Sequence, residues 1–156
     1  VWRWYRGASL IVGWNNVPKE FVSLVPISTL DIVIYPKIDG ITLYLVDVEG
    51  NEYSLLLGAS QHLISNSIWI VEISISEHLP QGQYINQNLL SIFNLFWNRA
   101  FQAFALDKTL NEINYDIIDS IIETGIDTIG THNFIFFGSD LSKDLILDLR
   151  LKLSVF

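Results

Sequence analysis

The chain has 156 residues, a length that suits a single domain. Half of its residues are hydrophobic and 17% are charged, against about 25% in typical soluble domains, which excludes a disordered chain and predicts a large core. The net charge of −8 argues against nucleic acid or an anionic membrane surface as a direct partner, and the absence of cysteine excludes disulfides and thiolate metal sites.

The amino-terminal residues combine aromatic and basic side chains. Residues 1–8 predict an extended arm that carries Trp2, Trp4 and Tyr5 beside Arg3 and Arg6. Such rings can stack on sugars or bases. Trp, Tyr and Arg also dominate the energetics of protein interfaces, which favours contact with a neighbouring protein chain. Both interpretations stay open at this stage.

The first half of the chain predicts strands, because its β-branched and aromatic runs end at turn-forming residues. We expect strands over Ser9–Trp14, Phe21–Val25, Leu30–Tyr35, Ile41–Val46, Glu52–Leu57 and Ile68–Ser76. The strongest local signal is a hairpin that joins the fourth and fifth of these runs. The turn between them, Asp47–Asn51, contains Gly and Asn, which accept a positive φ.

Residues Gln87–Ala105 form the most apolar segment, and their spacing predicts a helix. Roughly 220° of its helical wheel is apolar, about twice the width that a surface helix needs. The apolar arc contains five large aromatic residues: Phe93, Phe96, Trp97, Phe101 and Phe104. We therefore expect a helix that is covered on two sides, by its own sheet and by a neighbouring subunit.

A second helix is predicted from about residue 107 to about residue 129, with Asp107 as its N-cap and Gly130 after its end. One side of this helix would be rich in Ile and Leu. The opposite side would present an acidic stripe of Glu112, Asp116, Asp119, Glu123 and Asp127. The stripe can meet a basic groove on a neighbouring subunit, or it can be a solvated face that keeps the chain soluble. The solvated face is the favoured interpretation.

The carboxyl-terminal residues predict a hairpin. Asn133–Phe137 is a short apolar run that suits a buried strand. From Leu147 to Val155 apolar and polar residues alternate, the clearest period-two pattern in the chain. Residues 138–144 would link the two strands.

These elements predict one α+β domain over residues 1–156. We expect a mainly antiparallel sheet or small barrel of about eight strands, with two consecutive helices inserted before the carboxyl-terminal hairpin. Helices follow strands without regular β-α-β alternation, which argues against a doubly wound parallel sheet.

No motif predicts catalysis, and we expect no metal or cofactor. His62, His78 and His132 are scattered without metal-ligand spacing and are expected in turns or at the rim of the fold. Residues 58–62 lack the second Gly of a nucleophile elbow. The uncharged stretch between Glu77 and Arg99 contains Pro80, Gly82 and several amides, so we expect no membrane span. Met is absent even at position 1, so the chain is expected not to start at its translation start.

The leading functional hypothesis is a non-enzymatic structural subunit of a homo-oligomer or larger assembly, such as a virus or phage particle component. Its partners would be copies of itself or other assembly subunits. The aromatic residues of segment 87–105, the amino-terminal arm and the acidic stripe would form the interfaces. The alternative is a monomeric module that binds carbohydrate or a small ligand through its Trp and Tyr residues. An enzyme that uses carboxylate pairs, such as a glycosidase, is a third hypothesis.

Overall fold

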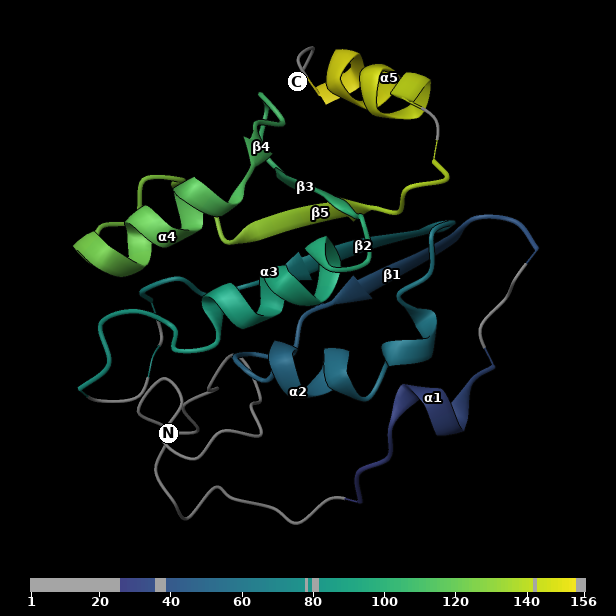
Figure 1. Ribbon diagram of the computed structural model, residues 1–156, viewed down its shortest axis with the longest axis horizontal. Coiled ribbons are helices and arrows are strands. Elements are labelled where there is room, and N and C mark those ends of the chain that lie inside the picture. Colours follow the sequence, from purple (N-terminus) through teal and green to yellow (C-terminus); the bar gives the residue numbers. More distant parts are fainter. Residues whose placement is uncertain (1–25, 36–38, 78, 80–81, 142, 154–156) are drawn as a thin grey trace, which may run out of the picture.

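The fold is built on a single mixed β-sheet (Figure 1). The computed structural model describes residues 26–35, 39–77, 79, 82–141 and 143–153. Five strands pair in the order β1-β2-β5-β3-β4: β1 Thr42–Val46, β2 Ser67–Glu72, β3 Gln102–Ala105, β4 Glu112–Ile113 and β5 Asn133–Phe137. β1 and β2 are parallel, and the other pairings are antiparallel. The α+β class is therefore confirmed, whereas eight strands or a barrel are wrong for the described chain, whose sheet has two edges.

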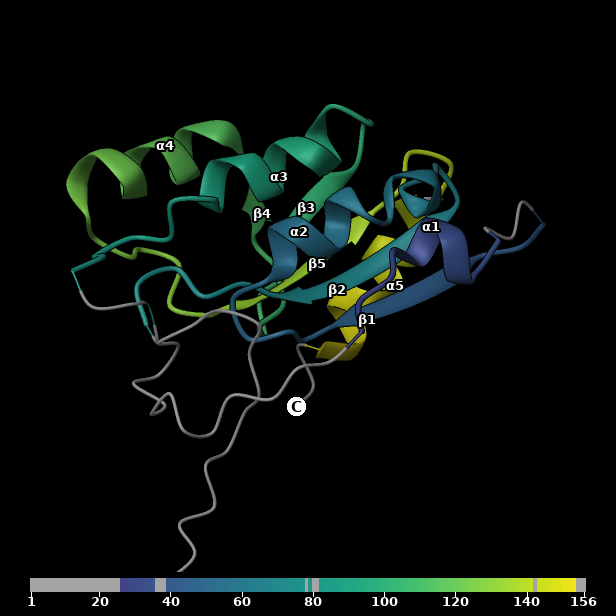
Figure 2. The same cartoon turned by 90° about the horizontal axis from the view of Figure 1, so that it is seen from below.

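Helices lie on both sides of this sheet (Figure 2). α2 (Glu52–Leu57), α3 (Leu89–Trp97) and α4 (Tyr115–Thr124) cover one side, and α5 (Lys143–Leu153) lies on the other. The short α1 (Leu30–Val33) and the 3-10 helix η3 (Ser60–His62) contact each other close to β1. We call the side under α2, α3 and α4 the helical side, and the side that α5 partly covers the open side.

The connection between β1 and β2 differs from the predicted hairpin. The turn was placed correctly, with Glu49 and Gly50 at φ values of 50° and 94°. Residues 52–57, however, form α2 rather than a strand, because Glu52 and Leu56 lie one helical turn apart and are both buried. α2 and η3 then provide the crossover that two parallel strands need. The predicted strand over residues 30–35 is also wrong, since residues 30–33 form α1.

The apolar segment predicted as one helix breaks in the middle. α3 ends at Trp97, and β3 begins at Gln102. Ala100 adopts the left-handed conformation, with φ at 59°, and the Phe101 backbone N–H donates to the Phe96 carbonyl at 3.2 Å. The left-handed residue that ends a helix is usually Gly. Because this position is Ala, the sequence gives no sign that the helix ends here. This ending is held by the pairing of β3 with β5 and by the Phe101 ring, which packs 5.4 Å from that of Phe96.

The second predicted helix is shorter than expected. Asp107 is not its N-cap; its Oδ1 accepts from the backbone N–H groups of Thr109 and Leu110 and closes the turn between β3 and β4. The cap is Asn114, whose Oδ1 accepts from the Ile117 N–H at 3.1 Å. α4 ends at Gly125, which is left-handed with φ at 69°. A short Asx turn and a true N-cap have the same sequence signal, which explains the misplacement.

The predicted hairpin at the carboxyl end is half correct. β5 spans Asn133–Phe137, as expected. Residues 147–153 of the alternating segment belong to α5 instead of a strand, and residues 154–155 lie outside the described residues. The residues of α5 are mostly Leu, Lys and Arg, which are good helix formers, whereas strands favour β-branched and aromatic residues. In a helix the alternation spreads Leu over two sides: Leu145, Ile146 and Leu149 pack toward the sheet, while Leu147 and Leu151 are exposed.

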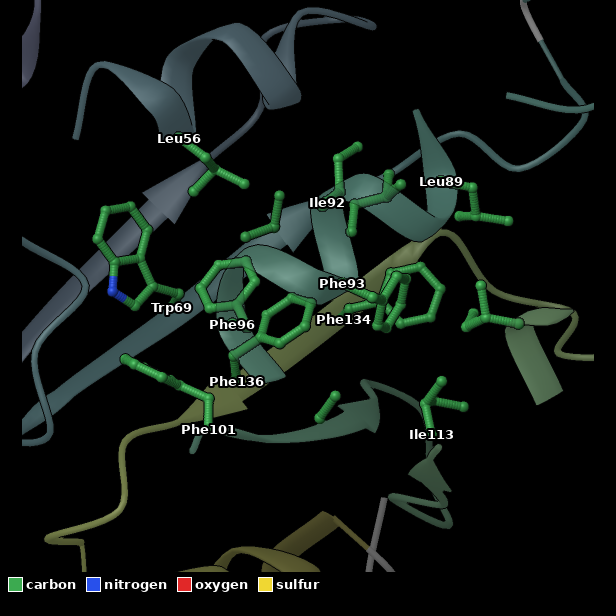
Figure 3. Packing of buried hydrophobic residues seen from close by; sticks show 14 of the residues in the cluster. Leu56, Trp69, Leu89, Ile92, Phe93, Phe96, Phe101, Ile113, Phe134 and Phe136 are labelled. Atoms are coloured by element: carbon green, nitrogen blue, oxygen red, sulfur yellow. The ribbon is translucent and has the colours of Figure 1, made fainter. Parts of the chain in front are cut away.

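The main core lies on the helical side, between the sheet and the helices (Figure 3). Phe96 of α3 stacks on Phe136 of β5 at 3.8 Å between ring centroids, and its edge meets Trp69 of β2 at 6.1 Å. Phe93 contacts both Phe134 and Phe136. All five of these side chains have no exposed area. The predicted strands over residues 9–14 and 21–25 and the amino-terminal arm lie outside the described residues.

Candidate interaction surface

Most of the aromatic residues predicted as interface anchors belong to the core of a single copy. Phe93 and Phe96 are fully buried under α3, and Phe101 is 4% exposed. Phe104 lies on β3, and its side chain enters the small cluster on the open side, next to Phe137. The excess apolar area inferred from residues 87–105 is therefore hidden within the chain. The helical wheel was wrong there because residues 102–105 form a strand, whose side chains alternate between two sides of the sheet.

Trp97 is the exception among these aromatics. It lies at the end of α3, is only partly buried, and packs against Phe93 at 5.2 Å and Tyr115 at 6.3 Å between ring centroids. Its ring joins α3 to α4 within the helical side. The other predicted anchors, Trp2, Trp4 and Tyr5, lie outside the described residues.

The predicted acidic stripe is not continuous. Only Asp116, Asp119 and Glu123 share α4, with Asp116 and Glu123 exposed and Asp119 partly buried. Glu112 lies on β4. Asp127 lies beyond the helix, where its Oδ1 accepts from the Ile129 N–H at 2.8 Å. These acids are consistent with a solvated face, and Asp116 also lies in the first helical turn, where the helix dipole favours a negative charge.

Exposed apolar residues lie around α1, at residues 32–35, and on the open side of the sheet. Side chains of adjacent strands form rows across this side, because paired residues of a sheet point the same way. One row comprises Leu45, Ile70, Ile135 and Phe104, and a second comprises Leu43, Ile68 and Phe137. Ile135, Phe104 and Phe137 are buried beneath Ile146 of α5.

The exposure of these rows rises steadily toward β1. Ile68 and Ile70 on β2 are half-buried, whereas Leu43 and Leu45 on β1 are 61% and 77% exposed. Beside them, Ile41 is also exposed, and a hollow of about 510 Å³ opens between residues of the β1 start and α5, lined in part by Ile41 and Leu145. We call Ile41, Leu43, Leu45, Ile68 and Ile70 the open apolar surface. Scattered exposed apolar residues are normal, whereas large contiguous apolar patches often belong to contact surfaces.

This open apolar surface carries no charge. Residues 41–46 include none of Asp, Glu, Lys or Arg, although the whole chain carries a net charge of −8. Acidic residues begin immediately beyond the strand, at Asp47, which is exposed. A partner can therefore cover β1 without desolvating an ion, which costs several kcal/mol when the ion is unpaired.

The sequence contained a signal for this surface that our expectations did not use. In residues 41–46 both alternating sets are apolar or aromatic, Ile41, Leu43 and Leu45 as well as Tyr44 and Val46. A strand with one solvated side would carry polar residues at every second position. Tyr44 stacks on Trp69 in the main core, which leaves the Leu side chains on the opposite side of the strand.

His62 is buried rather than at the rim, which corrects the expectation for this residue. Its Nδ1 lies 2.7 Å from the Tyr44 hydroxyl, and its Nε2 lies 2.9 Å from the Ile34 carbonyl oxygen. A carbonyl only accepts, so Nε2 donates and the Tyr44 hydroxyl donates to Nδ1. Burial raises the pKa of Tyr44. With both ring nitrogens hydrogen-bonded, His62 ties the end of α1 to β1.

His132 has partners that the sequence spacing did not reveal. Its Nδ1 lies 3.0 Å from Glu77 Oε1, and its Nε2 lies 3.7 Å from Glu72 Oε1. Although burial opposes it, hydrogen bonds from the Ser76 and Glu77 backbone and the interaction with His132 lower the pKa of Glu77. His132 is 45% exposed, so this group is a partly solvated surface cluster. His78 lies outside the described residues.

Glu52 is the one carboxyl group in the described chain with a buried oxygen that lacks a hydrogen-bond partner. Its Oε1 accepts from the Gly50 N–H at 2.7 Å, whereas Oε2 has no partner. Burial raises the pKa of Glu52, against the hydrogen bonds from the Glu52 and Gly50 backbone, and the charges of Glu72 and Asp47 raise it further. Among the described residues, however, no group of three or more His, Asp or Glu side chains is arranged to hold a metal ion.

Comparison with models of protein families finds no match, and neither do comparisons with curated proteins or with solved structures. Within the described chain, no helix combines the length and the apolar character that crossing a membrane requires.

Proposed function

We propose that this protein is a non-enzymatic structural subunit that associates with other protein chains through its open apolar surface. The observation that carries the proposal is the exposure of Leu43 and Leu45, 61% and 77%, at the uncharged end of two apolar rows whose other end is buried under α5. The proposal does not depend on the aromatic residues of segment 87–105.

The energetics support reversible association. Covering a Leu side chain contributes about 1.5–3 kcal/mol, so a contact that covers Leu43 and Leu45 on each of two chains contributes about 6–12 kcal/mol. Association costs about 4–15 kcal/mol in lost translational, rotational and side-chain freedom. A micromolar dissociation constant corresponds to about −8 kcal/mol, which these terms reach only at the favourable ends of both ranges. We therefore expect weak association that depends on concentration and that any further contacts would strengthen.

The test measures molar mass by size-exclusion chromatography with light scattering, over protein concentrations from about 1 µM to about 1 mM. We expect the mass to rise above 17.8 kDa with concentration in the wild type and to remain at the monomer value in Leu45→Asp. The matched control is Ile126→Asp, which introduces the same charge at a 62% exposed apolar residue that follows α4. This control should associate like the wild type.

Either of two results would contradict the proposal. A wild-type chain that stays monomeric throughout the concentration range would remove it. Equal effects of Leu45→Asp and Ile126→Asp would show that added charge, rather than loss of the open apolar surface, controls association. Binding of a small apolar compound to the monomer at the hollow between Ile41 and Leu145 would instead support the ligand-binding alternative.

A further inference from the structure

The outer edge of β1 exposes a regular set of backbone hydrogen-bonding groups. The Thr42 N–H donates to the Asn66 carbonyl on the β2 side, at 3.4 Å. The N–H and C=O of one strand residue point to the same edge, and successive residues alternate between edges. Thr42, Tyr44 and Val46 therefore face β2, while Leu43 and Leu45 direct their N–H and C=O groups outward. Within the described chain no strand pairs with this edge.

In β1 itself, this edge has none of the usual sequence features that prevent pairing with another chain. Natural edge strands are commonly short, or carry Lys, Pro or a bulge. β1 has five residues, no charge and no Pro, and its pairing with β2 runs through all five positions without interruption. β4, at the opposite edge, has only two residues, and one of them is Glu112.

The charge of the chain favours this edge for contact between identical copies. In a two-fold dimer the same patch of each copy meets itself, so a charged residue near the axis would face its own equivalent. Copies with a net charge of −8 repel one another, and this repulsion is smaller when they meet at a surface that keeps their acidic side chains apart. Residues 41–46 provide such a surface.

From these observations we infer that two copies of the chain pair antiparallel along the outer edges of β1, about a two-fold axis at Tyr44. This inference rests on the proposed function and names its partner, a second copy of the chain. In this register Leu43 of one copy lies opposite Leu45 of the other, and Thr42 lies opposite Val46, so all five residues of β1 are paired.

The register satisfies both the backbone and the side chains. Leu43 and Leu45 are the residues whose N–H and C=O groups point outward, and each opposed pair exchanges two hydrogen bonds. The Leu side chains of both copies lie on the same side of the joined sheet, because a two-fold axis perpendicular to the sheet preserves its sides. The exposed ends of the two apolar rows thus meet across the axis, and two five-stranded sheets become one.

A pair of substitutions at residue 45 separates backbone pairing from side-chain contact. Leu45→Ala removes the side chain and keeps the outward N–H, whereas Leu45→Pro removes both. Proline is tolerated at an edge position whose N–H faces outward. Since each dimer contains residue 45 twice, we expect Leu45→Pro to weaken dimerisation about ten-fold or more relative to Leu45→Ala. Circular dichroism and thermal melting identify any variant that fails to fold.

A cross-linking test does not depend on proline. The chain has no cysteine, so Leu43→Cys and Leu45→Cys each introduce a single thiol. In the inferred register these positions face each other at about 5.5 Å between Cα atoms, within the range for a disulfide. Two copies of the same variant place their thiols about 7–8 Å apart on the diagonal. We therefore expect the mixture of the two variants to form covalent heterodimers upon oxidation, and each variant alone to form few.

The outcomes distinguish this inference from the proposed function. Equal dimerisation of Leu45→Ala and Leu45→Pro, or homodimers of one cysteine variant as abundant as heterodimers, would overturn edge pairing in this register while association itself remained. A wild-type chain that is monomeric throughout the concentration range would remove the proposed function and the inference with it. Heterodimers together with a selective effect of proline would support both.

Discussion

The two sides of the sheet differ in how completely the chain covers them. On the helical side, Trp69 and Val71 of β2 and Phe134 and Phe136 of β5 have no exposed area. On the open side of the same strands, Ile68 and Ile70 remain half-buried, and exposure increases toward β1. One layer of helices suffices for the first side, whereas the second side is buried under α5 only at β5 and β3 and is partly covered at β2.

This difference separates residues that hold the monomer together from residues that are available to a partner. Core side chains contribute to folding in every copy, whatever the concentration. Exposed apolar side chains contribute little to the monomer, because they stay in contact with water after folding. Substitutions on the helical side should therefore change stability and leave association intact, whereas substitutions on the open apolar surface should do the reverse.

The largest effect is expected on the helical side, at Phe96. Phe96→Ala removes a fully buried ring that stacks on Phe136 and contacts Trp69, and should lower the free energy of unfolding by about 3–5 kcal/mol. Chemical denaturation measures this loss. At concentrations where the variant is still folded, its association should equal that of the wild type. A variant that retains wild-type stability would contradict the assignment of Phe96 to the core.

A series along one row should define the boundary between the two kinds of residue. Ile135→Ala, beneath α5, should lower the free energy of unfolding by about 2–5 kcal/mol. Leu45→Ala, 77% exposed, should change it by no more than about 0.5 kcal/mol at a protein concentration that keeps the chain monomeric. Ile70→Ala should fall between them. If the loss in free energy of unfolding does not decrease as exposure increases, the open side is covered in solution.

Glu52 should make stability fall as pH rises. Its pKa in the folded chain is raised above the ordinary 4.5, mainly by burial, so the folded state binds a proton more tightly than the unfolded state. This contribution to stability is complete below the ordinary pKa of 4.5 and is lost as pH rises through the raised pKa. Each pH unit that separates the folded and unfolded pKa values corresponds to about 1.4 kcal/mol.

Glu52→Gln removes this titration, so the stability of the variant relative to the wild type should increase as pH rises from 4.5 through the raised pKa and should level off above it. Chemical denaturation from about pH 4 to about pH 8 measures it. Glu123→Gln, at an exposed carboxyl group of α4, is the control and should follow the wild type. The lowered pKa of Glu77 is common to all three proteins and cancels in the comparison. A difference that is constant with pH would contradict the raised pKa of Glu52.

The smallest effect is expected where α3 passes into β3. Ala100 has a φ of 59°, a conformation that costs an L-residue about 1–2 kcal/mol. Gly adopts it freely but loses more entropy on folding, so Ala100→Gly should stabilise the chain by about 0.5–1 kcal/mol. Thermal unfolding measures this gain, with Ala105→Gly, in the buried end of β3, as a control that should destabilise. A loss of stability in Ala100→Gly would argue against the left-handed residue.

The local spacing of apolar residues predicted the structure well where a segment forms a single helix or strand. β5 was predicted with its observed bounds, and β1 and β2 were predicted within a few residues of theirs. The predictions were wrong where a segment divides into two elements, or where its spacing fits both a strand and a helix. Residues 87–105 have the apolar content of a broad helix, but they divide into a helix and a strand at a residue that is not Gly. The alternating Leu residues of 147–153 fit a strand, and they form a helix with two apolar sides.

The candidate site was predictable only in part. The expectation that the chain has more apolar surface than it can cover remains, but it was placed at Phe93, Phe96, Phe101 and Phe104, which the chain buries by itself. The sequence predicted that Leu43 and Leu45 lie in a strand, but it did not predict that they are exposed. Exposure depends on which strand lies at the edge of the sheet and on how far α5 extends across the open side, and neither follows from local spacing.

The sequence by itself determined the large apolar core, the α+β class, the strands β1, β2 and β5, and the absence of charge between residues 41 and 46. These properties follow from composition and from short-range periodicity, which act within a few residues. Only the tertiary structure decided that β1 lies at an edge, that β3 follows α3, and that the α5 segment forms a helix. Those outcomes depend on pairing and packing between segments far apart in the chain, whose free energy outweighs the local preferences of each segment.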